Sequence, residues 1–174
     1  MTDLPPCQAA SELRRLTDAA LSAVAPDGAV LRHLHLDGGK LTLIDESGAP
    51  VWSGRLDAYR RIRVLGAGKG AAPMAAALEN LLGDRISDGL VIVKYGHDLP
   101  EGQRTRHIRI KEGGHPVPDE AGAAAAGEIV DMARDSREDD LVLCTFTGGA
   151  SALTPALHPE IPLADMQRLT CMLL

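Results

Sequence analysis

Short apolar runs alternate with helical patterns and glycine-rich turns through the second half of the chain. The apolar positions predict strands at residues 61–65, 89–93, 108–110 and 141–146, and helices at residues 71–82 and 120–133. Strands that alternate with helices in this way are typical of an α/β fold. We therefore expect residues 61–174 to form a Rossmann-like α/β domain, with a mostly parallel sheet and helices on both faces.

The first 60 residues follow a less regular pattern. Residues 13–24 carry apolar side chains at helical spacing, Ser11 can cap this helix, and Pro26-Asp27-Gly28 stops it. The residues after this turn fit a helical turn or a strand at 30–36, a strand at 41–44, and a connecting loop or turn at 52–59. We expect residues 1–60 to be an N-terminal helix with a strand and loop region that packs on the α/β core.

A glycine-rich turn joins the first strand of the α/β domain to its helix. Gly66, Gly68 and Gly70 lack Cβ atoms at points where a backbone must turn sharply or approach a ligand. The following helix points its first N–H groups and the positive end of its dipole into the same crevice, and Lys69 adds an ammonium group there. This combination indicates a site for a phosphate or a carboxylate. The alternative is a turn that only packs the helix on the strand.

Two known glycine motifs can be compared with this turn. A Walker A loop is absent, because Lys69 follows the first glycines too soon and is itself followed by Gly70. The dinucleotide fingerprint fits by spacing, with Gly66, Gly68 and Ala71 in its three small-residue positions. An acidic residue should then end the next strand, but that strand ends in Lys94-Tyr95. The fingerprint alone is therefore weak support for a nicotinamide cofactor.

A second glycine turn follows the strand at 141–146. Gly148 and Gly149 allow backbone N–H groups to face inward, and Thr147 and Ser151 add hydroxyl donors, so this turn is a second candidate for a phosphate site. The alternative is a strand-to-helix turn that needs glycine only for its geometry.

A polar loop at residues 113–119 follows the strand at 108–110. Pro116 and Pro118 restrict this loop and hold His115 in place, either as a catalytic group or as a structural hydrogen-bonding residue. Asp119 is placed to cap the next helix, or to bind a ligand. Ligands of parallel sheets bind at the carboxyl ends of the strands, so we expect the loops at 66–70, 113–119 and 147–151 to meet.

Composition narrows the range of partners. A length of 174 residues suits one α/β domain, and a net charge of −6 with 2% aromatic residues disfavours binding to nucleic acid. Cys7, Cys144 and Cys171 form no CxxC pattern, which favours a reducing compartment, and the histidines form no metal-ligand cluster. No apolar run is long enough to span a membrane. We therefore expect a cytoplasmic protein without a metal site made of its own side chains.

Three motifs together resemble the glycerate 2-kinase family, some members of which are named hydroxypyruvate reductase. They are VLGAGKGAAPMA at 64–75, EGGHPVPDE at 112–120 and TGGASAL at 147–153. The resemblance implies an enzyme that transfers the ATP γ-phosphate to the 2-hydroxyl of D-glycerate with Mg²⁺, in a cleft between this α/β domain and a C-terminal domain. It also implies that Lys69 is the active-site lysine and that residues 148–151 are the glycine-serine phosphate loop. His115 or Asp119 would orient the attacking hydroxyl.

The chain departs from the family pattern in several places. Thr147 and Ala150 replace a Ser and a Gly of the phosphate loop, and Ala150 would be strained if its φ had to be positive. Gly70 stands where Ala is usual, which loosens the start of the helix. Family members are more than twice as long, so we expect part of the active site to be absent and the isolated chain to have little activity. The alternatives are an NAD(P)-dependent hydroxypyruvate reductase and an inactive nucleotide-binding fragment. The sequence leaves open whether the chain forms a homo-oligomer.

Overall fold

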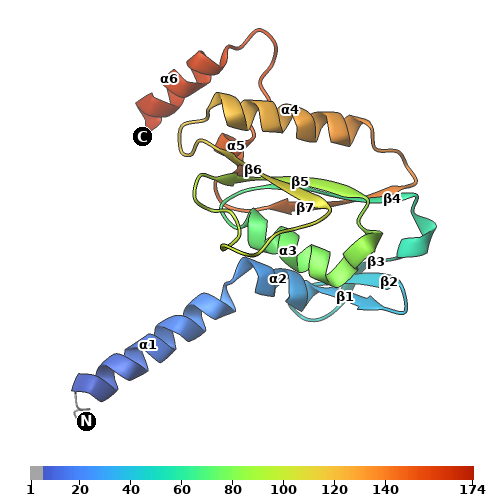
Figure 1. Cartoon of the computed structure of the whole chain (residues 1–174), viewed down its shortest axis with the longest axis vertical. Helices are drawn as coiled ribbons and strands as arrows, with labels where there is room; N and C mark the ends of the chain where they lie inside the picture. Colours follow the sequence, from blue (N-terminus) through green and yellow to red (C-terminus); the bar gives the residue numbers. More distant parts are fainter. Residues whose placement is uncertain (1–5) are drawn as a thin grey trace.

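The computed structural model describes residues 6–174 and contains two β-sheets, with helices packed around the larger one (Figure 1). The larger sheet has four parallel strands in the order β6-β5-β4-β7. These strands are β4 (Arg61–Ala67), β5 (Asp88–Lys94), β6 (Ile108–Gly113) and β7 (Asp140–Phe146). Helix α3 (Ala71–Leu82) covers one face, and α4 (Glu120–Arg134) with the short α5 (Ala150–Leu153) covers the other. The expected α/β class, with helices on both faces of a parallel sheet, is confirmed.

Successive side chains of the central strands point to opposite faces of the sheet. Val64 of β4 and Val91 of β5 lie in one core cluster with Leu78 of α3. Ala67 and Ile92 point to the other face, where they pack with residues of α4 and α5. Because both faces are covered, these strands are continuously apolar rather than alternating. Full burial of one such Val, Leu or Ile side chain stabilises the fold by about 1.5–3 kcal/mol.

The elements before β4 form a small antiparallel sheet in the order β1-β2-β3 and pack on α3 (Figure 1). Val30, Leu41 and Leu56 are buried in the same core cluster as Leu78 of α3. These elements are α1 (Pro6–Ala23), α2 (Pro26–His33), β1 (Leu34–Asp37), β2 (Lys40–Ile44), β3 (Pro50–Arg55) and the 3₁₀ turn η1 (Leu56–Ala58).

Several local predictions for this region were wrong or incomplete. The first helix begins at Pro6 rather than after Ser11, and Pro26 begins a second helix because proline suits a first helical turn. Residues 30–36 contain both of the expected alternatives, since α2 ends at His33 and β1 follows at once. The segment at 52–59 was expected to be a loop, but its first part is strand β3, which pairs with β2.

Helix α1 and the last helix, α6 (Leu163–Leu173), extend from the body of the molecule (Figure 1). Leu13 and Leu16 of α1 are each 67% exposed, and α6 buries none of its residues. The apolar spacing in α1 therefore predicted a helix correctly, although this helix has no packing partner within residues 6–174. No helix in that range is both long and apolar enough to cross a membrane.

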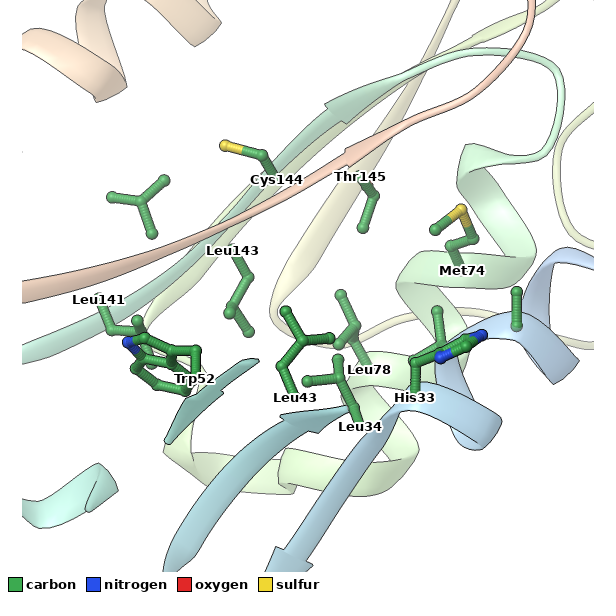
Figure 2. A pocket seen from close by; sticks show the side chains of 13 residues that line it. His33, Leu34, Leu43, Trp52, Met74, Leu78, Leu141, Leu143, Cys144 and Thr145 are labelled. Atoms are coloured by element: carbon green, nitrogen blue, oxygen red, sulfur yellow. The ribbon is translucent and has the colours of Figure 1, made fainter. Parts of the chain in front are cut away.

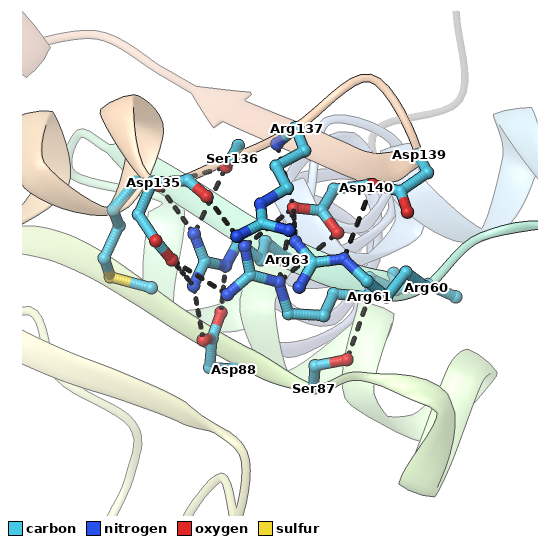
Figure 3. A network of polar contacts seen from close by, with 12 residues as sticks. Arg60, Arg61, Arg63, Ser87, Asp88, Asp135, Ser136, Arg137, Asp139 and Asp140 are labelled. Atoms are coloured by element: carbon cyan, nitrogen blue, oxygen red, sulfur yellow. Dashed lines mark hydrogen bonds and ion pairs between the residues drawn. The ribbon is translucent and has the colours of Figure 1, made fainter.

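A network of arginines and aspartates joins the strands at the amino-terminal edge of the sheet (Figure 3). Arg63 of β4 is only 4% exposed, and its guanidinium forms ion pairs of 2.9 Å with Asp88 and with Asp135. The buried carboxylate of Asp140 pairs with Arg61 at 2.8 Å, and this hydrogen bond lowers the pKa of Asp140 far below its ordinary value. The network ties β4 to the starts of β5 and β7, and it lies at the edge opposite to the glycine turns.

Candidate functional site

The loops at 66–70, 113–119 and 147–151 meet at the carboxyl edge of the parallel sheet. The backbone N–H of Lys69 donates a hydrogen bond to the carbonyl of Gly148 at 3.0 Å. A Cβ atom on Gly149 would lie 2.8 Å from the His115 ring and 3.6 Å from the Cε atom of Lys69. One residue of each loop is therefore in contact with a residue of another, and the expected convergence is confirmed.

Two glycines allow β4 and β7 to end side by side. A Cβ atom on Gly66 would overlap the hydroxyl and carbonyl of Thr145. Gly68 has a φ of 130°, and a Cβ atom there would overlap Thr147. The contact between neighbouring strands at Gly66, and between the turns that follow them at Gly68, thus accounts for the absence of a side chain at both positions without any ligand.

The backbone donors of the first glycine turn are used inside the protein. Gly68 N–H donates to the carbonyl of Ile92 at 2.9 Å, and Gly70 N–H donates to the Thr147 hydroxyl at 3.0 Å. The N–H groups of residues 69 and 71 also have backbone partners. The N–H groups of residues 68–71 are thus all used within the protein, contrary to expectation. The N–H of Ala72, in the first turn of α3, has no hydrogen-bond partner within residues 6–174. What the turn does offer is the Lys69 ammonium, which is exposed and makes no ion pair with any residue of the described range.

The second glycine turn has the free donors. Gly149 adopts a left-handed φ of 94°, which turns the chain between β7 and α5. Within residues 6–174, the N–H groups of Gly148, Gly149 and Ser151 have no hydrogen-bond partner. Successive N–H groups around a left-handed residue form a concave binding site for an anion. Residues 148–151 are hereafter called the N–H cradle, and Lys69 lies beside it.

Two departures from the family pattern fit their places. Gly70 packs against α2, where a Cβ atom would come within 2.7 Å of Pro26 Cγ. Gly70 therefore permits a close approach rather than loosening the helix. Ala150 begins α5, and no described residue other than glycine has a positive φ, so the strain expected at Ala150 does not arise.

His115 is partly buried and faces the N–H cradle across Gly149. Burial of the ring, followed by the positive charges of Lys69 and Lys94, holds the pKa of His115 below its ordinary value. This shift favours the neutral form of the imidazole. A neutral imidazole has one nitrogen able to accept a hydrogen bond or a proton, which suits it to the hydroxyl of a substrate.

Asp119 caps α4 in the way that its position predicted. Its Oδ1 accepts a hydrogen bond from Gly122 N–H at 2.8 Å, and its Oδ2 accepts one from the Tyr95 hydroxyl at 2.8 Å. Burial alone would raise the pKa of Asp119, but the N–H groups of Gly122 and Gly114 and the Tyr95 hydroxyl lower it below the ordinary value. Both carboxylate oxygens are therefore engaged within the protein.

Sequence reasoning missed two residues that follow β5. Tyr95 binds Asp119, and His97 Nδ1 lies 3.3 Å from the carbonyl of Lys69. His97 is half-buried beside the site. Their position just after a buried strand was the available signal, because the carboxyl ends of parallel strands share one edge.

The described residues contain no group of three or more His, Cys, Asp or Glu side chains that could hold a metal ion. Mg²⁺ commonly keeps several water ligands and is held through substrate phosphates with few protein ligands. The hydroxyl of Ser151 and the N–H cradle suit the phosphates better than the ion itself. These residues therefore fit Mg²⁺ only as an ion that a nucleotide would carry.

An apolar hollow of about 520 Å³ lies away from these loops, between α2, the antiparallel sheet, α3 and the edge strand β7 (Figure 2). Leu43, Trp52 and Leu143 line it, and none of its lining residues is an acid, a lysine or an arginine. His33, the one histidine of its wall, has Nδ1 3.1 Å from the carbonyl of Ile44. The hollow therefore lacks the charge that a phosphate or carboxylate site needs.

Several known proteins are similar to this chain in sequence. A family described as a domain of unknown function, DUF4147, matches residues 12–174. A protein of Agrobacterium vitis, named as a hydroxypyruvate reductase without firm assignment, is 43% identical over 105 residues, which cover 60% of this chain and 26% of that protein. The glycerate 2-kinase of Pyrococcus horikoshii is 31% identical over 160 residues, covering 92% of this chain and 33% of the kinase.

A solved structure is similar as well. The crystal structure of the glycerate kinase of Thermotoga maritima matches with a TM-score of 0.69 and 27% identity, over 94% of this chain and 35% of that one. The chain thus spans about a third of the length of these kinases. The match over nearly all of its residues shows that the chain belongs to the DUF4147 family, which is the family of the glycerate 2-kinases.

Proposed function

We propose that this chain forms one wall of a kinase site, which transfers the γ-phosphate of ATP to the 2-hydroxyl of D-glycerate and yields 2-phosphoglycerate. The observation that carries the proposal is the free ammonium of Lys69 beside the N–H cradle at residues 148–151. The names of the Pyrococcus and Thermotoga relatives support the reaction and its acceptor. Because the chain covers about a third of those kinases, the complete site is expected to include a second wall.

Phosphoryl transfer depends on alignment and on neutralising negative charge, so few reacting side chains are needed. The N–H groups of Gly148, Gly149 and Ser151 would donate to phosphate oxygens of the nucleotide. Lys69 would stabilise the charge on the transferring phosphoryl group, or hold the carboxylate of glycerate. Mg²⁺, carried by the nucleotide, would neutralise further phosphate charge.

The acceptor hydroxyl needs a partner that orients it. His115 fits this role because its ring lies against Gly149, at the centre of the cradle, and its lowered pKa favours the neutral form. Asp119 acts on the site as a positioning residue, since it caps α4 and binds Tyr95. Thr147 holds the two glycine turns together by accepting a hydrogen bond from Gly70 N–H, and its hydroxyl hydrogen is still able to donate.

The test compares Lys69→Met and Lys69→Arg with the unchanged protein, in its complete form as expressed from its gene. A preorganised donor of this kind is worth about 10²–10³ in rate, so the kcat for glycerate phosphorylation should fall by that factor in Lys69→Met. Arg should restore only part of it, because a planar guanidinium differs in shape from an ammonium. Lys40→Met is the matched control, since Lys40 is an exposed lysine of β2 in the antiparallel sheet, outside the site. An unchanged kcat in folded Lys69→Met would refute the proposed role.

A reductase remains the second candidate because of the name of the Agrobacterium relative. Against it, β5 ends in Lys94 and is followed by Tyr95, so the acid that binds the ribose of NAD is not at its usual place. Oxidation of NADH or NADPH with hydroxypyruvate, in the absence of ATP, would favour the reductase. Binding of ATP without any transfer to glycerate would favour an inactive nucleotide-binding protein.

A further inference from the structure

A groove of about 540 Å³ opens beside Lys69, between α2, α3 and the loop that follows β5. Its volume lies in the range of ordinary small-molecule sites. Lys69 and His97 lie on its wall, and the contact of 3.3 Å between His97 Nδ1 and the Lys69 carbonyl links the loop to the glycine turn. The groove is therefore continuous with the candidate phosphate site, on the side away from β7.

Helix α3 forms the floor of the groove, which is lined there by short apolar side chains. Three short side chains of α3 contribute to it, those of Pro73, Ala76 and Ala77. Leu31 of α2 and Leu99 of the loop also line the groove. None of the three α3 side chains is longer than a proline ring, so this part of α3 is suited to a planar ring.

The charges in the groove are unevenly distributed. Lys69 is the one lysine or arginine that lines it, whereas Asp27 and Asp98 place two carboxylates on its wall. Carboxylates repel phosphate oxygens but accept hydrogen bonds from neutral hydroxyl groups. A phosphate would therefore stay at the Lys69 end, and the part of a ligand that enters the groove should be uncharged and rich in donors.

Two amides complete the polar edge. Asn80 of α3 and Gln103 of the loop line the groove, and neither side chain makes a hydrogen bond within residues 6–174. An amide presents two donor hydrogens and one acceptor oxygen, which is the complement that the edge of a nucleobase requires. The loop is held in shape by backbone hydrogen bonds, including Gln103 N–H to the Pro100 carbonyl at 3.0 Å.

We propose that this groove receives the base and ribose of the phosphate-donor nucleotide, with the base on the alanine floor of α3 and its phosphates at Lys69. The inference rests on the proposed kinase function. It adds a binding site for the nucleoside, made by Asn80, Gln103, Asp27 and Asp98, to the phosphate site at the glycine turns.

The experiment titrates the 174-residue chain with ADP and, separately, with inorganic tripolyphosphate, by calorimetry. Ala76→Leu fills the floor of the groove without changing any charged residue. It should lower the affinity for ADP at least about tenfold, as steric changes of a few methylenes in a binding pocket do. The affinity for tripolyphosphate should stay unchanged. Ala19→Leu, on the exposed helix α1, is the matched control and should change neither affinity.

A double variant, Asn80→Ala with Gln103→Ala, serves if Ala76→Leu fails to fold, because both amides are exposed and their loss should spare the fold. The double variant should also lower the affinity for ADP and leave the affinity for tripolyphosphate unchanged. Unchanged ADP affinity in the folded variants would overturn the inference, and so would an equal loss for tripolyphosphate. If the protein phosphorylates glycerate while these variants bind ADP normally, only the groove assignment fails. If the unchanged chain binds neither probe and the complete protein transfers no phosphate, the proposed function fails with it.

Discussion

Gly149→Ala should damage both the fold and the candidate site, for a reason that can be read from the geometry of one residue. Gly149 has a φ of 94°, and a Cβ atom there would lie 2.8 Å from two atoms of the His115 ring. A left-handed φ outside glycine costs about 1–3 kcal/mol. Crowding of a packed ring costs about 1–3 kcal/mol more, so the sum is roughly 2–5 kcal/mol after partial relaxation.

That loss is a large fraction of the stability of an ordinary domain, which is about 5–15 kcal/mol. Urea denaturation followed by circular dichroism should show a lower midpoint with an unchanged slope. In thermal unfolding, each kcal/mol should lower Tm by about 2–4 °C for a chain of this size. Binding of tripolyphosphate should weaken as well, because the N–H groups of the cradle and the His115 ring would be displaced together.

Gly148→Ala is the matched control, one residue away in the same turn. Gly148 does not have a positive φ, and a Cβ atom there would meet nothing within 4 Å. Its replacement should leave stability unchanged, or raise it by about 0.4–1 kcal/mol through the unfolded chain. Equal midpoints for the two alanine variants would refute the argument from backbone conformation and contact.

Two further predictions concern charge. Arg63→Met removes ion pairs with Asp88 and Asp135 and the hydrogen bond to the Met132 carbonyl at 2.7 Å. It should lower the free energy of unfolding, measured in urea, by about 1–3 kcal/mol, because both aspartates are exposed enough to regain water. A variant as stable as the unchanged chain would contradict this structural role. His115 should titrate below its unperturbed value of about 6.5 in ¹H–¹⁵N NMR spectra, and its pKa should rise when phosphate binds beside it. Because the folded pKa is depressed, its contribution to stability is present above about pH 6.5 and is lost as the pH falls through the folded pKa. An unchanged titration in phosphate would place the anion elsewhere.

Much of the fold was predictable because its signals are local. The strands at β4, β5 and β7 appear as continuous apolar runs, and a strand buried on both faces has that composition wherever it lies in the sheet. Asp119 was placed as a cap because the preference for an acid before a helix depends only on the next few residues. The meeting of the three loops followed from strand polarity alone, since parallel strands end at one edge.

Strand β3 was missed because its identity depends on a partner. Residues 50–55 include a glycine and a serine and have no regular apolar alternation, so their own preferences do not favour a strand. They form one because β2 supplies the other half of the hydrogen-bonded ladder. Gly70 was misread for a similar reason, since the contact that requires a glycine comes from Pro26, in another helix.

The sequence by itself determined the α/β architecture, the positions of the glycine turns and the place of Lys69 among them. Only the tertiary structure decided which N–H groups of the two turns are already hydrogen-bonded within the protein. In the first turn, Gly70 N–H donates to the hydroxyl of Thr147, which is 77 residues away. The N–H groups of Gly148, Gly149 and Ser151 have no partner in the part of the chain that the structure describes. Glycine spacing in a sequence shows where a backbone can bend. Whether its N–H groups are available depends on which distant acceptors folding brings to them.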